Sequence, residues 1–63
     1  MSDHVSGNVQ VSLDLALEVV AELKDPIKFD TGAMVVYTGH HPQRGRLHIV
    51  IPPMGMSLFL PAA

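Results

Sequence analysis

Residues 9–23 have the sequence VQVSLDLALEVVAEL, the longest patterned run in the chain. Apolar residues alternate with polar or small ones over 9–19, which is typical of a half-buried strand. From Leu13 to Leu23 the same residues also form a broad apolar arc beside an acidic stripe, as in an amphipathic helix. Because the alternation fails at residues 19–21, we predict a strand at about 9–12 followed by a helix at about 13–24. A strand through all of 9–19 is the alternative.

The residues at both ends of this run favour the helix. Ser12 is suited to cap its first turn, where Asp14 places a negative charge close to the positive end of the helix dipole. At the other end, the positive charge of Lys24 suits the negative end of the helix dipole. Asp25 precedes Pro26, and a residue before proline is pushed out of the helical region of backbone space. The acidic stripe (Asp14, Glu18, Glu22 and Asp25) is expected to be solvated, with docking of a basic partner as the sharper alternative.

The rest of the chain predicts a small sheet. Residues 25–33 are interpreted as a connection and 39–45 as a loop, because both contain turn residues. The β-branched and apolar runs at 34–38, 46–51 and 57–60 are predicted strands. The fold class is therefore α+β, with one helix packed on a small, mainly antiparallel sheet of strands at about 9–12, 34–38, 46–51 and 57–60.

We predict that the strands at 34–38 and 46–51 form a hairpin with Thr38 opposite Leu47. In that register Tyr37 lies beside His48, and both faces of the sheet are largely apolar. A single helix covers one face, so the other needs more of the chain or another subunit. The residues expected at such an interface are Val35, Tyr37, Val50, Met54, Met56, Leu58, Phe59 and Leu60.

Length and composition also indicate a partner. The 63 residues allow one small domain, predicted at 9–63 after a polar tail at 1–8. A chain of this size buries only about 60% of its unfolded surface. It has no cysteine, 48% hydrophobic residues and 16% charged residues, against about 25% charged in typical domains. A small domain poor in solvating groups is suited to oligomerisation or to burial in a larger assembly.

Charge and hydropathy argue against two other kinds of partner. The net charge is −2 and the four basic residues form no large patch, which argues against nucleic-acid binding. Residues 47–63 are shorter than the ~20 residues of a spanning helix and contain Pro52-Pro53, so we expect no membrane span. The N-terminus lacks the features of a signal peptide. We therefore expect a location in the cytoplasm or within a virion.

The residues that could carry chemistry do not form a known catalytic or metal-binding motif. Three imidazoles, of His40, His41 and His48, could converge near the hairpin, but their spacing matches no zinc signature. The serines lie outside any nucleophile elbow, and the glycines form neither a P-loop nor a dinucleotide fingerprint. We predict a protein that is not an enzyme and has no cofactor or metal.

The function predicted from these observations is a non-enzymatic structural or interaction subunit, acting as an oligomer or as a small component of a larger assembly. A phage or viral particle accessory protein is one concrete form of this hypothesis. The alternative is a small regulatory protein that binds a protein or nucleic-acid partner through a basic hairpin tip. That tip would comprise His40, His41, Arg44 and Arg46.

Overall fold

The computed structural model describes residues 9–61, which form one helix and five strands. The helix packs on a single antiparallel sheet, so the predicted α+β fold is confirmed. In chain order the elements are β1 (Val9–Val11), α1 (Leu13–Glu22), β2 (Lys24–Asp30), β3 (Val35–His41), β4 (Gly45–Ile51) and β5 (Ser57–Pro61).

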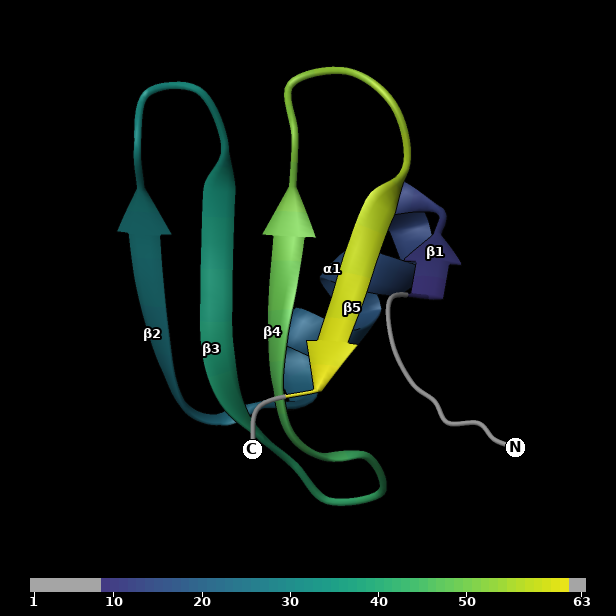
Figure 1. The fold of residues 1–63 in the computed structure, drawn as a ribbon. Helices are drawn as coiled ribbons and strands as arrows, with labels where there is room; N and C mark the ends of the chain where they lie inside the picture. The colour runs from purple at the N-terminus through teal and green to yellow at the C-terminus, as the bar shows by residue number, and fades with distance from the viewer. Residues whose placement is uncertain (1–8, 62–63) are drawn as a thin grey trace, which may run out of the picture.

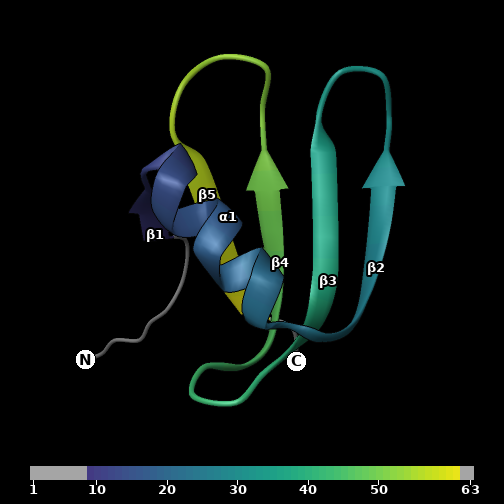
Figure 2. The ribbon, with the colours of Figure 1, turned by 180° about the vertical axis from the view of Figure 1, so that it is seen from behind.

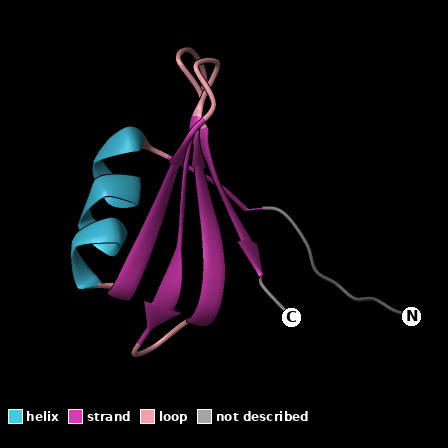
Figure 3. Cartoon of the chain, turned by 90° about the vertical axis from the view of Figure 1, so that its left-hand side faces the viewer, coloured by secondary structure: helices cyan, strands magenta, loops and turns pink. Residues whose placement is uncertain are grey.

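The strands lie in the order β1-β5-β4-β3-β2, so the first two strands of the chain form opposite edges of the sheet (Figure 1). Helix α1 connects these edges and crosses one face of the sheet (Figure 2). β5 pairs with both β1 and β4 and is therefore an interior strand of its own sheet. Seen from the side, the helix and the sheet form two layers (Figure 3).

The run at 9–23 is a short strand followed by a helix, as predicted. Ser12 has an extended backbone, and its hydroxyl accepts a hydrogen bond from the Leu15 N–H at 3.2 Å, so it is the N-cap. The helix ends at Glu22, two residues earlier than predicted. The reason is that Lys24 already pairs with His40 of β3, so the chain must become extended at Leu23.

The prediction that residues 25–33 are a connection is wrong, because most of them belong to strand β2. The strand was not predicted because Pro26 argues against one. Pro26 lies at a β-bulge, where the register shifts between Lys24 and Ile27, and Asp25 has a φ of 50°. Proline is tolerated at such a bulge on an edge strand, where its missing N–H removes no ladder bond. Only the turn at 31–34 connects β2 to β3.

The predicted register of the β3–β4 hairpin is wrong by one residue. His48, and not Leu47, lies opposite Thr38, and Tyr37 lies opposite Ile49. The predicted loop at 39–45 is also too long, because β3 continues to His41 and only residues 42–44 form the turn. Gly45, the residue directly after this turn, has a φ of 75°, and a residue in the left-handed region at the end of the turn is common in short hairpin connections.

The core lies between α1 and the centre of the sheet. It contains Val11, Ala16, Val19, Leu23, Leu47, Ile49 and Phe59, with Leu15, Val20, Tyr37 and Ile51 packed against it. Because side chains alternate between the faces of a strand, Leu47, Ile49 and Phe59 define the helix-facing side. Among the described residues, no helix is long and apolar enough to cross a membrane.

Candidate functional site

The face of the sheet opposite the helix is the candidate site, and we call it the open face. Within residues 9–61 no other element lies over it (Figure 3). The register places two rows of side chains across its strands. Directly opposed residues give one row of Gln10, Leu58, Val50, Val36 and Phe29 and a second row of Leu60, His48, Thr38 and Ile27.

The first row is apolar except at its β1 end, and its apolar side chains are accessible. Phe29 is 58% exposed, and Ile27 in the second row is 56% exposed. Val36, Val50 and Leu58 are half-buried by their neighbours within the sheet. Single exposed apolar side chains are ordinary, whereas a continuous row on one face makes that face a candidate interaction surface.

A third row makes the other end of the open face basic. Arg46 lies opposite His40, and His40 lies opposite Lys24. Together with Asp25, Ile27, Thr38 and Gly39, these three residues line a shallow hollow beside the β2 bulge. The open face therefore changes from apolar to basic along the strand direction.

The structure divides the predicted interface residues between the two faces. Val50, Leu58 and Leu60 lie on the open face, as an interface would require. Val35, Tyr37 and Phe59 lie on the helix side, where Phe59 is only 6% exposed within the core. Met54 and Met56 lie in the loop between β4 and β5 and are 86% and 50% exposed.

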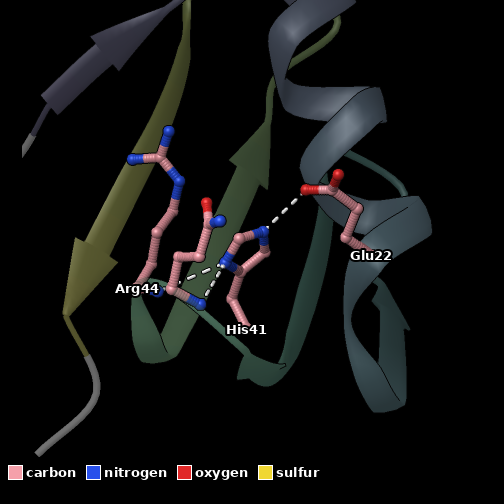
Figure 4. A network of polar contacts seen from close by, with 4 residues as sticks. Glu22, His41 and Arg44 are labelled. Carbon is pink, nitrogen blue, oxygen red and sulfur yellow. Dashed lines mark hydrogen bonds and ion pairs between the residues drawn. The ribbon is translucent and has the colours of Figure 1, made fainter.

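The predicted basic tip is also divided. His40 and Arg46 lie on the open face, whereas His41 is a buried residue of β3 and not part of a loop. Its Nε2 lies 2.7 Å from Oε1 of Glu22 in α1 (Figure 4). Its Nδ1 accepts hydrogen bonds from the backbone N–H groups of Gln43 and Arg44 at 3.1 and 3.2 Å.

These contacts assign His41 a structural role. Because Nδ1 accepts two hydrogen bonds, the ring proton lies on Nε2, which donates to the Glu22 carboxylate. The ring thereby ties the β3–β4 turn to the last turn of α1. In the same turn, the Arg44 guanidinium carbon lies 5.2 Å from the centre of the Phe59 ring, a distance at which a cation is attracted to an aromatic face.

The remaining histidine of the sheet has an ordinary cross-strand partner. Nδ1 of His48 lies 2.8 Å from the Thr38 hydroxyl, its direct neighbour in the register. The three imidazoles do not converge, since His41 lies on the helix side and His40 and His48 on the open face. Among the described residues, no group of three or more histidine, aspartate or glutamate side chains is arranged to hold a metal ion. His4 and the rest of the predicted tail at 1–8 lie outside the described residues.

Sequence reasoning missed Ile27, Phe29, Val36 and Lys24 as members of this surface. For the β2 residues a signal was present, since apolar and charged residues alternate in Ile27-Lys28-Phe29-Asp30, which is typical of a strand. Val36 was missed because the predicted register placed it on the other face.

A comparison of the chain with family models, curated proteins and solved structures finds no match.

Proposed function

We propose that this chain is a non-enzymatic structural or interaction subunit, which works as an oligomer or as a small component of a larger assembly. The observation that carries the proposal is the apolar row on the open face, from Leu58 through Val50 and Val36 to Phe29, which no element of residues 9–61 covers. Burial of apolar surface contributes roughly 25 cal/mol per Å², so covering this row stabilises an association. A phage or viral particle would be one setting for such a subunit.

The native mass of the purified chain, measured by light scattering, tests this proposal. We expect a mass above that of the 6.8 kDa monomer. Val50→Lys places a charge in the middle of the apolar row and should lower the mass. Leu17→Lys is the matched control, because Leu17 is also apolar but lies on the outer side of α1, 48% exposed.

Circular dichroism of both variants should match the wild type, which separates lost association from lost folding. A wild-type chain that stays monomeric and stable at all concentrations would contradict the proposal. So would a loss of association in Leu17→Lys equal to that in Val50→Lys.

A second candidate function, a small regulatory binding protein, is favoured by the hollow lined by Lys24, His40 and Arg46. These residues could bind carboxylates or phosphates of an acidic partner. Arg46→Ala should weaken binding of a labelled polyglutamate peptide or a short DNA duplex. Arg44→Ala should not, because Arg44 packs over Phe59. Equal effects of the two substitutions, or no binding to either probe, would reject this function.

A further inference from the structure

Strand β2 presents an unpaired edge. It lies at one edge of the sheet, and its only neighbour among the described residues is β3 (Figure 1). All seven of its residues are exposed. An exposed edge is a template for pairing with a strand of another chain. The features of β2 decide which strand fits.

The hydrogen-bond alternation fixes which backbone groups of β2 are free. The Thr31 N–H donates to the Met34 carbonyl at 3.0 Å, and these two residues lie opposite each other at the turn. Hydrogen-bonded and non-hydrogen-bonded pairs alternate along an antiparallel ladder. Ile27 and Phe29 therefore direct their N–H and C=O groups towards β3. Lys28 and Asp30 direct theirs outwards, where the described chain offers no partner.

One end of this edge is closed to pairing. The bulge between Lys24 and Ile27, with the left-handed Asp25, disturbs the strand, and Pro26 has no N–H to donate. The usable edge is 27–30. Its centre, Lys28-Phe29-Asp30, carries opposite charges on either side of Phe29, so it is complementary to itself when reversed.

We propose that the occupant of this edge is the β2 strand of a second copy, paired antiparallel with Phe29 opposite Phe29. Lys28 of each copy then lies opposite Asp30 of the other, and their outward backbone groups form the new hydrogen bonds. This inference rests on the proposed function and names the partner as the chain itself.

No neighbouring register fits as well. Centring the pairing on Lys28 places two lysines opposite each other, and centring it on Asp30 does the same for two aspartates. Like charges directly opposite are destabilising. Centring it on Ile27 places Lys28 opposite Pro26, which cannot donate a hydrogen bond. The register centred on Phe29 alone pairs opposite charges and uses every outward N–H of 27–30.

The geometry of this pairing is that of a symmetric dimer. The two-fold axis passes between the two Phe29 residues, perpendicular to the sheet, and such isologous contacts are the commonest in homo-oligomers. Phe29 and its copy form a non-hydrogen-bonded pair, in which side chains approach most closely. The product is one continuous ten-stranded sheet, with both helices on one side and both open faces on the other.

A charge-swap experiment tests the register. Lys28→Asp alone places two carboxylates in each cross-strand pair, and Asp30→Lys alone places two ammonium groups there. We expect each variant to weaken dimerisation about tenfold or more, because the dimer contains the pair twice. Mixing the two variants restores both opposite-charge pairs in the heterodimer, so the mixture should regain the wild-type mass.

Two further variants serve as controls. Glu18→Lys makes a charge change of the same sign as Asp30→Lys, but at an exposed position of α1 outside the paired segment, and should leave the mass unchanged. Lys28→Pro removes an outward N–H that β3 does not use, so it should abolish the dimer while circular dichroism retains the strand signal. Mass is measured by light scattering over a concentration series, with and without Val50→Lys to remove association through the open face.

The outcomes separate this inference from the proposed function. Recovery of mass on mixing Lys28→Asp with Asp30→Lys supports the edge dimer, since misfolded chains could not rescue each other. If Val50→Lys dissociates the protein and the β2 variants keep the wild-type mass, the edge dimer is rejected and the proposed function stands. If the wild type is a monomer throughout the series, both are rejected.

Discussion

The His41 ring offers the sharpest test of how the β3–β4 turn is held. It makes two separate contributions: Nδ1 accepts from the N–H groups of Gln43 and Arg44, and Nε2 donates to Glu22. His41→Asn separates them, because its side-chain oxygen lies as far from Cβ as Nδ1 does. It keeps an acceptor for the turn and loses the contact with the helix. His41→Phe keeps the ring volume and loses both.

The structure gives different magnitudes for the two losses. The Glu22 side chain is 60% exposed, against 3% for His41, so solvent screens their pair and its removal costs about 1 kcal/mol or less. An unpaired buried donor costs about 1–3 kcal/mol. Gln43 and Arg44 lie in an exposed turn, where water replaces part of this loss. We expect the unfolding free energy to fall by about 1 kcal/mol in His41→Asn and by about 2 kcal/mol or more in His41→Phe.

Urea denaturation followed by circular dichroism, at one fixed protein concentration, measures both changes. Glu22→Gln is the matched control, since its amide oxygen still accepts from Nε2, and it should stay within about 0.5 kcal/mol of the wild type. If His41→Phe is as stable as the wild type, the turn contacts contribute nothing. If His41→Asn loses as much as His41→Phe, the division between Nδ1 and Nε2 is wrong.

Two further substitutions, with a third on the open face as a control, test the packing beneath the helix. A Cβ on Gly39 would lie 3.2 Å from both Cβ of Leu23 and the Lys24 carbonyl oxygen. Gly39→Ala should therefore lower the unfolding free energy, measured by urea denaturation, by about 1–3 kcal/mol. An unchanged unfolding free energy would mean that the start of β2 shifts freely. Ile49 is fully buried, and Ile49→Ala should cost about 2–5 kcal/mol, whereas Val50→Ala on the open face should cost about 1 kcal/mol. Equal losses at Ile49 and Val50 would show that the faces are assigned wrongly.

The helix and its cap could be predicted because their signals are local. Ser12, Asp14 and the apolar arc of α1 all act within one or two helical turns, so no distant contact is needed to recognise them. The strands at β3, β4 and β5 were recognised from β-branched and apolar residues for the same reason. The prediction was wrong for β2, because Pro26 is a local signal against a strand. The alternation from Ile27 to Asp30 was the better guide, because a proline at a bulge on an edge strand costs no ladder bond.

The candidate site could be predicted only in part, because the register of the β3–β4 hairpin decides which side chains lie on the open face. A shift of one residue moves every side chain of a strand to the opposite face. The predicted loop begins at Gly39, whereas in the structure Gly39 is a buried residue of β3 that lies against Leu23, just before β2. The contact between Gly39 and Leu23 joins residues far apart in sequence, and no local sequence pattern predicts it. Pro42 followed by Gly45 was the available sign of a three-residue loop, from which the observed register follows.

The edge and the open face are geometrically coupled, although they are tested separately. The apolar row of the open face ends at Phe29, which is also the centre of the proposed edge pairing. Joining two copies there would continue the row from one sheet into the next without covering it. An edge dimer would therefore present twice the apolar surface in one plane, and a symmetric partner could engage both halves at once. Linked engagement raises apparent affinity without any new kind of contact. Lys28→Asp should then weaken association through the open face, even though Lys28 itself lies on the helix side of the sheet.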